Sequence, residues 1–320
     1  MVKNNDILMC KDGALTGKVC FVDDKILPQI EVMVNEHVYI FRGKPNIMHQ
    51  SYLFYCLNSD IIQSQINKNL AYNKGAQPGL NREHINSIYI FLLSLEKQQK
   101  IIEELNSYQK IIEGAKQIID NWHPYFEINK QWEIVKFGYI IINKLKSNIL
   151  SLEHKEYTTL IVCKKGKMIN INTAIKGDIP VIAVGRVSPY SHNQYNFNGN
   201  IITISSLGAY AGYIWYHNSP MWASDCNVIY SINEKLLLTK YLYYILKSQQ
   251  NIIYQKQAGS GQPQVYLKDL EDLQIPIPPL EEQQKMVTEL DNNQSKIDNL
   301  KNYIKQFENK LKTTLNSLWQ

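Results

Sequence analysis

The sequence has few of the residue types that cross-link a chain or hold a metal. Its 320 residues include five cysteines, which are scattered and never form a Cys-x-x-Cys pair. This pattern argues against a disulfide framework and against a zinc site, and it suits a reducing cytoplasm. Arginine is also scarce, because Arg42, Arg82 and Arg186 stand beside 31 lysines. The net charge of +5 is a weak basic excess that by itself says little about partners.

Long apolar runs are missing as well. No stretch approaches the roughly 18 uninterrupted apolar residues of a membrane span. The first residues, MVKNNDILMC, lack the apolar region of a secretory signal. We therefore expect a cytoplasmic chain without a membrane partner. At 320 residues with 44% hydrophobic content, the chain can build two domains with separate cores.

The motifs of several enzyme classes are absent. The sequence contains no [DN]PP[YF] tetrapeptide of an adenine methyltransferase, no GK[ST] of a phosphate loop, and neither HExxH nor GxSxG. The nearest match to the first motif is HPYF at 123–126, which we interpret as a turn between domains. GSGQ at 259–262 precedes YLKDL and is not a cofactor loop. We therefore predict a chain that is not an enzyme and that holds no metal or cofactor.

What the sequence does contain is an internal repeat. Residues 75–106 align without a gap to residues 260–291, with a constant offset of 185 residues and ten identical pairs among 32. Leu95 thereby matches Leu280, and Gln98 matches Gln283. A period this long excludes a solenoid, whose repeats span 20–50 residues. The repeat indicates two copies of a module, each with a globular part followed by a helix.

Each copy ends in a helical heptad pattern. Apolar residues alternate at spacings of three and four over several turns, as in the a and d positions of a coiled coil. The residues of this predicted seam are Ile101, Leu105, Tyr108, Ile112 and Ile119 in the first helix, and Leu290, Asn293, Ile297, Leu300, Ile304, Phe307 and Leu311 in the second. We expect the two helices to pair with each other, with Tyr108 and Asn293 as interruptions that set the register. The alternative is that each helix packs on its own domain.

The globular parts read as short strands joined by turns. Residues 4–21 and 199–216 match each other at an offset of 195 residues, which pairs Gly13 with Gly208 and Gly17 with Gly212. The glycine spacing predicts a tight corner between two strands, although a plain hairpin turn is an equal alternative for the glycines themselves. The second module begins near Trp132. Its counterpart would lie before Met1, so we expect the first module to lack its opening segment of about 64 residues.

These strings resemble a known family. GSGQPQVYLKDLEDLQIPIPPLEEQQKMVTELD, with its weaker echo at 75–106, is similar to the repeated region of type I restriction-modification specificity subunits. WEIVKFGYIIIN at 132–143 resembles the opening of a target-recognition domain, and residues 177–230 resemble its core. In the first copy, Phe91, Leu93 and Ser94 replace the prolines of the pattern. The resemblance covers essentially the whole chain apart from the opening of the first domain.

The resemblance implies an α+β fold. It consists of two target-recognition domains of mixed strands and helices, joined by two long helices that form an antiparallel coiled coil. The expected division is a partial first recognition domain at 1–93, a helix at 94–123, a second recognition domain at 124–277 and a helix at 278–320. The implied partners are double-stranded DNA and methyltransferase (modification) subunits, with a nuclease subunit left open. The chain would read a bipartite DNA site, and the helices would set the spacing between the half-sites.

Candidate DNA contacts follow from residue chemistry, because arginine can fork onto guanine and an amide onto adenine, whereas lysine typically contacts phosphate. In the second domain the base-reading candidates are Arg186, Ser188, Tyr190, His192, Asn193, Gln194, Tyr210 and Tyr213, and the phosphate candidates are Lys256 and Lys268. In the first domain the candidates are Lys11, Lys18 and Arg42. The alternative at each position is an ordinary surface side chain.

Two other functions stay open at this stage. The chain could be the C-terminal specificity segment of a fused restriction-methyltransferase, in which case a [DN]PP[YF] motif would precede it in the reading frame. It could also be a pair of lectin-like or adaptor modules held by a coiled coil without a DNA role. Binding that does not weaken with salt would favour that last interpretation.

Overall fold

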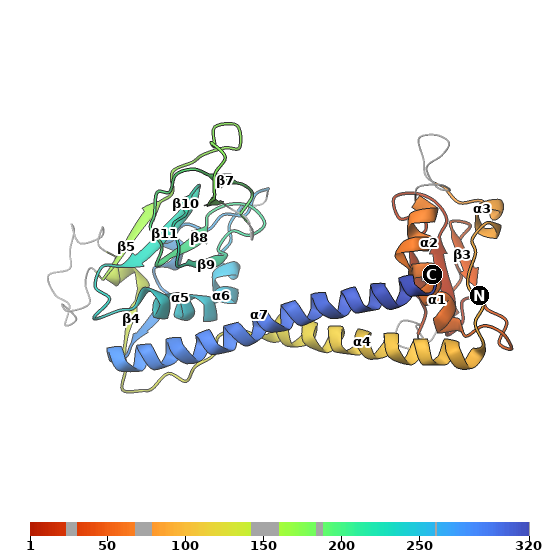
Figure 1. Ribbon diagram of the computed structural model, residues 1–320. Coiled ribbons are helices and arrows are strands. Elements are labelled where there is room, and N and C mark those ends of the chain that lie inside the picture. The colour runs from red at the N-terminus through yellow and green to blue at the C-terminus, as the bar shows by residue number, and fades with distance from the viewer. Residues whose placement is uncertain (24–30, 68–78, 142–159, 184–187, 260, 320) are drawn as a thin grey trace. The chain divides into compact units, whose positions relative to one another are not determined.

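The computed structural model describes residues 1–23, 31–67, 79–141, 160–183, 188–259 and 261–319, which form two compact units (Figure 1). Unit 1 consists of Met1–Asn121 and Ile297–Gln320, and unit 2 consists of Trp122–Lys296. None of the helices in the described ranges combines the length and the apolar character needed to cross a membrane.

A three-stranded antiparallel sheet lies at the core of unit 1. Its strands are β1 (Ile7–Cys10), β2 (Val19–Phe21) and β3 (Val38–Phe41), in the order β2-β1-β3. Four helices follow: α1 (Gln50–Asn58), α2 (Asp60–Gln65), α3 (Arg82–Asn86) and α4 (Leu95–Asn121). Strand alternation places Ile7 and Met9 on one face, where they are buried in a cluster with Leu53 and Leu57 of α1.

Unit 2 contains the same plan with additional strands. A four-stranded sheet has the order β5-β11-β8-β9 and consists of β5 (Ile161–Lys165), β8 (Ile201–Ser205), β9 (Ile214–His217) and β11 (Cys226–Ser231). After it come α5 (Thr239–Ser248), α6 (Gln250–Gln255), the 3-10 turn η5 (Leu267–Leu270), β12 (Gln274–Ile277) and α7 (Leu280–Ser317). The added elements are β4 (Glu133–Lys136), the 3-10 turn η2 (Phe137–Ile140) and a small sheet of β6 (Ile179–Ile182), β7 (Ser191–His192) and β10 (Trp222–Ala223).

The sequence repeat is therefore a structural repeat. Strands β1, β2 and β3 occupy the places of β8, β9 and β11, and α1 and α2 occupy the places of α5 and α6. The predicted equivalence of residues 4–21 and 199–216 is confirmed, since each folds as a pair of antiparallel strands. Among its described residues, unit 1 has no counterpart of the strands β4 to β7. The first-copy residues Gln77 and Pro78 lie outside the described ranges.

One glutamine in each copy joins the long helix to the globular part. The Gln98 side chain accepts a hydrogen bond from the His49 N–H and donates to the carbonyl oxygens of Ile47 and Leu93, all at 2.8 Å. Gln283 makes the same three bonds, with the N–H of Leu238 and with the carbonyls of Leu236 and Pro278, at 2.8–2.9 Å.

Both glutamines are fully buried. Each satisfies the first turn of α1 or α5, where helical N–H groups have no partner within the helix. We call this set of three bonds the glutamine clamp. It explains why this polar residue is retained in both copies at a position that faces the core.

The two glycine corners are also equivalent. Gly17 and Gly212 have φ angles of +82° and +84°, which side-chain-bearing residues rarely adopt. A Cβ atom at Gly17 would lie 2.5 Å from Ile66 Cγ2, and one at Gly212 would lie 2.8 Å from Ile253 Cγ2. The corner is thus tight because the helix that follows packs directly against it, and a plain hairpin turn does not account for this contact.

The long helices α4 and α7 carry the predicted seam. Within unit 1, the rings of Tyr108 and Phe307 lie 5.6 Å apart, and Thr314 Oγ1 donates to Glu104 Oε1 at 3.2 Å. Because lower numbers in α4 contact higher numbers in α7, these stretches run antiparallel. Of the seam residues, Leu105, Ile112, Leu290 and Ile297 are buried, and Ile101, Tyr108, Ile119, Asn293, Leu300, Ile304, Phe307 and Leu311 are partly exposed.

The clamp predicts a large stability difference between two adjacent glutamines. Replacing Gln283 by Ala removes the partner of one N–H and two carbonyls, and leaving a buried group without a partner costs about 1–3 kcal/mol, which applies in full only to the buried Pro278 carbonyl. We expect Gln283→Ala to lower the free energy of unfolding of unit 2 by about 2–4 kcal/mol, measured by urea unfolding with hydrogen exchange on α5. Gln284→Ala, at the exposed next position, should change it by less than about 0.5 kcal/mol. Equal effects of the two substitutions would contradict the clamp.

The glycine corner predicts a difference between two glycines of similar backbone conformation. Gly208 also has a positive φ, of +79°, but a Cβ there would meet nothing within 4 Å. Gly208→Ala should therefore incur only the backbone strain, about 1–2 kcal/mol. Gly212→Ala should cost about 1–3 kcal/mol more, because the new methyl group overlaps Ile253. Thermal unfolding of the two variants tests this order, and a Gly208→Ala variant as unstable as Gly212→Ala would refute it.

Candidate nucleic-acid interface

Two loops of unit 2 meet beside the small β10-β6-β7 sheet. The Tyr190 hydroxyl donates to the Ile169 carbonyl at 2.6 Å, and the Ile175 N–H lies 3.1 Å from Nδ1 of His192. A Cβ on Gly177 would lie 2.5 Å from the Asn193 Cα, so glycine permits the close approach of these loops. Residues 169–177 thereby lie against residues 190–193.

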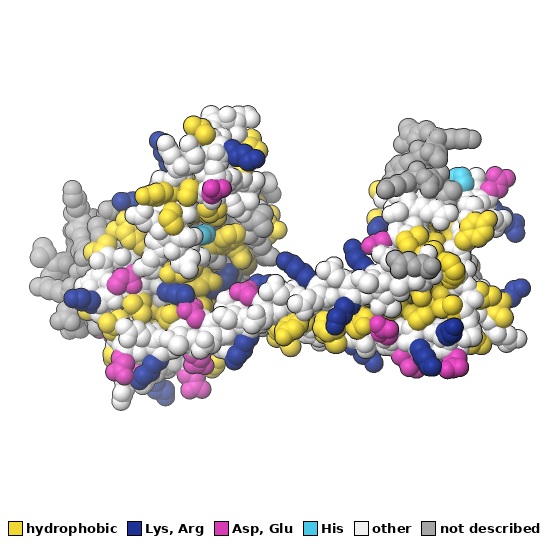
Figure 2. Space-filling view, viewed as in Figure 1, with side chains coloured by type: hydrophobic (Ala, Val, Ile, Leu, Met, Phe, Trp, Pro, Cys, Tyr) yellow, Lys and Arg dark blue, Asp and Glu magenta, His cyan; other side chains and the backbone are white. Residues whose placement is uncertain are grey.

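This end of unit 2 exposes cations beside amide and aromatic side chains. Four exposed lysines belong to β5 or to the loop after it, and we call this group the lysine face: Lys164, Lys165, Lys167 and Lys176. Asn193, Gln194 and Tyr195 are exposed in the adjoining loop. Dark blue lysine side chains are visible around the loops at this end of unit 2 in Figure 2. Lysines that hold phosphate, next to amides that can read base edges, are what a DNA-reading loop requires.

The electrostatics of the lysine face favour contact with an anion. The Lys165 ammonium lies 3.7 Å from an Asp225 carboxylate oxygen, yet 72% of the Lys165 side chain is exposed. Lys167 lies above the Trp222 ring, with its nitrogen 6.0 Å from the ring centroid. Such exposed pairs contribute little to stability, so these cations can turn toward a phosphate at small cost.

The structure separates the predicted contacts of this loop into two kinds. The Ser188 hydroxyl lies 2.9 Å from the carbonyl oxygens of Val181 and Tyr190, so it is engaged within the unit. The Tyr190 hydroxyl is likewise bonded to Ile169, and burial raises its pKa. Asn193 and Gln194 are exposed, and Asn193 lies against Gly177, the residue after Lys176. Arg186 lies outside the described residues.

The two histidines of this region are not cationic contacts. His192 is buried, and its ring packs against Trp222 with centroids 4.9 Å apart. Burial lowers the pKa of His217 to about 4, and its Nε2 lies 2.8 Å from the Thr203 hydroxyl. His217 is therefore neutral at physiological pH and offers no charge to a phosphate.

The glycine corner of unit 2 forms a second group of candidates. Tyr210 is 39% exposed there, and the Lys247 ammonium lies 4.0 Å from the Tyr213 ring centroid. Lys256 is paired with Asp272 at 2.8 Å, which weakens its case as a phosphate contact. Lys268 lies above the Tyr266 ring at 5.4 Å from its centroid.

In unit 1 the predicted contacts also differ in availability. The Arg42 Nε and Nη2 donate to the two carboxylate oxygens of Asp6 at 2.6 and 2.7 Å. The Asp6 side chain is buried, and its pKa is lowered first of all by this pairing. The Arg42 guanidinium thus neutralises a buried carboxylate. Because this role is structural, Arg42 is not available to contact DNA bases. Lys18 is exposed and Lys11 is partly exposed at the first glycine corner.

Sequence reasoning missed the lysine face. The signal was present as the cation-rich string KKGK at 164–167, which follows a strand. The structure links the end of this string to His192 through Trp222, whose indole N–H donates to the Lys167 carbonyl and whose ring packs against the His192 ring.

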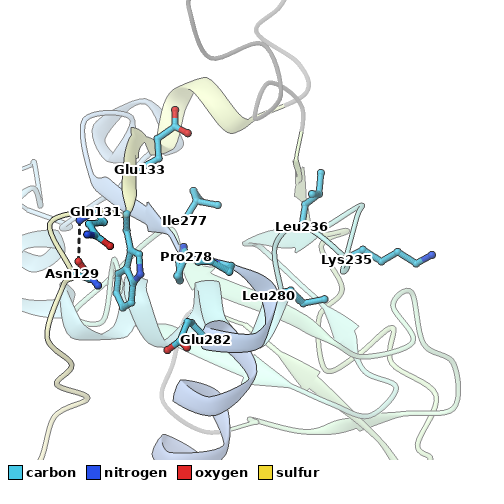
Figure 3. A pocket seen from close by; sticks show the side chains of 11 residues that line it. Asn129, Gln131, Glu133, Lys235, Leu236, Ile277, Pro278, Leu280 and Glu282 are labelled. Atoms are coloured by element: carbon cyan, nitrogen blue, oxygen red, sulfur yellow. Dashed lines mark hydrogen bonds between the residues drawn. The ribbon is translucent and has the colours of Figure 1, made fainter.

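A surface pocket of about 680 Å³ lies in unit 2 at the start of α7 (Figure 3). Its lining combines the apolar residues Ile277 and Pro278 with the carboxylates of Glu133 and Glu282. Lys235 also lines it, but its side chain extends away from the other labelled residues in Figure 3. Two carboxylates disfavour a phosphate ligand here. Within the described ranges, no cluster of three His, Cys, Asp or Glu side chains is arranged to hold a metal ion.

Comparisons with known proteins identify the family of this chain. Residues 1–121 and 131–309 match the family described as type I restriction modification DNA specificity domain. A Haemophilus influenzae protein named as a type I restriction enzyme specificity subunit is 24% identical over 274 residues, which are 80% of this chain and 67% of that protein. A Mycoplasma pneumoniae protein named as a type I specificity subunit is 30% identical over 95 residues, which are 29% of this chain and 30% of that protein.

Solved structures share the fold. The type I restriction-modification S subunit from M. genitalium aligns with a TM-score of 0.57 and 17% identity, over 98% of this chain and 83% of that chain. A chain from a study of complex assembly and conformational transition in a type I restriction-modification system aligns with a TM-score of 0.55 and 16% identity, over 100% of this chain and 82% of that chain. Because the family match covers both structural repeats, this chain belongs to the type I restriction-modification DNA specificity family.

Proposed function

We propose that this chain reads a bipartite DNA sequence for a type I restriction-modification system. The observation that carries the proposal is the presence of two equivalent modules in one chain, each with a glycine corner and a glutamine clamp. Two equivalent readers in one polypeptide fit a target made of two half-sites. Nothing in the fold or in the family match favours a segment of a fused restriction-methyltransferase.

The lysine face and its adjoining amides are the proposed contact of the second module. Lys164, Lys165 and Lys167 would hold phosphates, which fixes the position of the loop without specifying sequence. Asn193 and Gln194 would reach base edges in the major groove, where an amide side chain forms two hydrogen bonds with adenine. Their exposure supports these roles, as does the contact of Asn193 with Gly177, the residue after Lys176.

The long helices are the proposed spacer. In this division, residues 1–93 and 124–277 are the two recognition domains, and the helices at 94–123 and 278–320 pair as an antiparallel coiled coil. The antiparallel contacts of Tyr108 with Phe307 and of Glu104 with Thr314 support the pairing. A rigid helical pair of fixed length would set the number of base pairs between the half-sites.

Catalysis is assigned to partner subunits. The sequence has no methyl-transfer motif, and the proposed role of the chain is to position DNA without itself reacting. A modification subunit would flip the target adenine out of the duplex and transfer the methyl group, because a base inside the stack cannot be reached. A nuclease subunit would join the same assembly.

The proposed phosphate contacts predict a change in salt dependence. For B-DNA, a plot of log K against log salt concentration has a negative slope, and its magnitude grows by about 0.9 for each phosphate contact. We expect the K164A/K165A/K167A variant to reduce the slope for a random-sequence duplex by about 2–3, measured by fluorescence anisotropy. The matched control K301A/K305A/K310A removes three exposed lysines from α7 and should leave the slope unchanged. A slope that is the same in both variants would remove the lysine face from the interface.

The division of labour between modules predicts a change in one half of the methylated site. The chain and its modification subunit are expressed together in a host, whose methylated motif is read by whole-genome sequencing. Asn193→Ala with Gln194→Ala should relax or alter one half-site and leave the other intact, since a lost amide pair removes about 1–3 kcal/mol of base discrimination. The control Gln109→Ala with Gln117→Ala, on α4, should leave the motif unchanged. Changes in both halves would contradict separate reading.

A further inference from the structure

Unit 2 closes one side of its core with its opening segment. Strand β4 pairs antiparallel with β12, with Val135 opposite Ile275 and Glu133 opposite Ile277. The turn η2 continues this contact, since the N–H groups of Phe137 and Gly138 donate to the carbonyls of Leu273 and Glu271 at 2.8 and 2.9 Å. A Cβ on Gly138 would lie 3.0 Å from the Glu271 Cβ, so glycine favours this close approach.

The covering segment also fills the core. Phe137 and Ile140 are buried in one cluster with Leu270, Leu273 and Ile275. Strand β12 is consequently well covered, with Ile275 fully buried and Ile277 6% exposed.

Unit 1 holds the counterpart of β12, which has no paired strand among the described residues. The repeat offset of 185 residues maps β12 onto residues 89–92. The mapping holds in space, because the Tyr52 hydroxyl donates to the Phe91 carbonyl at 2.9 Å just as Tyr241 donates to Pro276 at 2.9 Å. Among the described residues, no strand pairs with 89–92, and none of these four residues takes part in a backbone–backbone hydrogen bond.

The uncovered segment exposes apolar side chains. Leu92 is 58% exposed, against 6% for its counterpart Ile277. Ile85 and Ile88 are partly buried, whereas their counterparts Leu270 and Leu273 are buried. Tyr89 and Phe91 are 83% and 48% exposed. An unpaired backbone edge beside exposed apolar side chains is a template for an added strand.

Proline 276 shows which backbone groups of this edge can pair. It has no N–H, and its carbonyl accepts from Tyr241, so its backbone groups face away from β4. The pairing groups of β12 are therefore those of its neighbours Ile275 and Ile277, which lie opposite Val135 and Glu133. In unit 1 the corresponding edge groups belong to Ile90 and Leu92.

We propose that residues 89–92 form a docking edge for a strand-and-turn segment of another polypeptide with the chemistry of residues 132–141. That segment adds antiparallel to the edge through the backbone of Ile90 and Leu92. It inserts two large apolar side chains, at the spacing of Phe137 and Ile140, over Ile85 and Ile88, and it carries a glycine after the first of them. The occupant is identified by the way unit 2 covers the equivalent edge. This inference does not depend on the DNA role.

The experiment uses a fluorescein-labelled peptide of residues 131–141, QWEIVKFGYII, and the full-length chain. We expect saturable binding by fluorescence anisotropy. Leu92→Pro removes an edge N–H and should weaken binding at least about tenfold. Phe91→Pro is the matched control, because Pro276 occupies that position in unit 2 and β12 still pairs. It should change the affinity by less than about twofold. A peptide with Phe137→Asp should not bind, and this arm leaves the chain unaltered.

Three results would overturn the proposal. The first is absence of peptide binding to a chain with native circular dichroism. The second is equal binding by the Leu92→Pro and Phe91→Pro variants, which would mean that the peptide exchanges with β4 in unit 2. The third is that the chain forms a dimer which the Leu92→Pro substitution dissociates but which added peptide does not dissociate. In that case a second copy of the chain occupies the edge.

Discussion

The buried glutamine clamp is the interaction on which each module depends. A long helix and a globular part meet through one side chain that satisfies one N–H and two carbonyls, and the same geometry occurs at Gln98 and at Gln283. An amide can do this because it is a donor and an acceptor at once, whereas a carboxylate would only accept. The clamp fixes where the long helix starts relative to the short helix that follows the sheet. Every contact made farther along the long helix then starts from that point.

One more hydrogen bond near the clamp occurs in both modules, with the same donor residue type and a different acceptor. Tyr55 bonds to Asn106 and Tyr244 bonds to Asp291, so the acceptor differs while the tyrosine is kept. In unit 2 the aspartate also pairs with Lys240 at 2.6 Å, which adds a charged contact that a neutral amide does not need. A duplicated frame of this kind can hold different loops, and the loops are where two modules must differ if each reads its own half-site.

The family relationship gives meaning to features that are ambiguous alone. Exposed lysines are ordinary on a protein surface, and the four of the lysine face would carry little weight by number. Their position matters, since residues 169–177 lie against residues 190–193, which brings the loop that carries Lys176 beside the candidate amides. Arg42, the arginine proposed from the sequence as a DNA contact of unit 1, is instead engaged within its own unit. Arg42 serves a buried carboxylate, because an unpaired Asp6 in that position would be costly.

The sequence by itself determined the duplication, the two long helices and the glycine corners. Repeats, heptad spacing and paired glycines are local signals, and each is written in consecutive residues. The tertiary structure decided the rest. It engaged Ser188, Tyr190 and Arg42 within their own units, and it placed the loop that carries Lys176 against Asn193. It also left residues 89–92 without a paired strand in the described part of the chain. These outcomes depend on which side chains and backbone edges meet across long sequence separations. Such contacts depend on packing and hydrogen bonding across the whole folded chain, and local residue type and spacing do not reveal them.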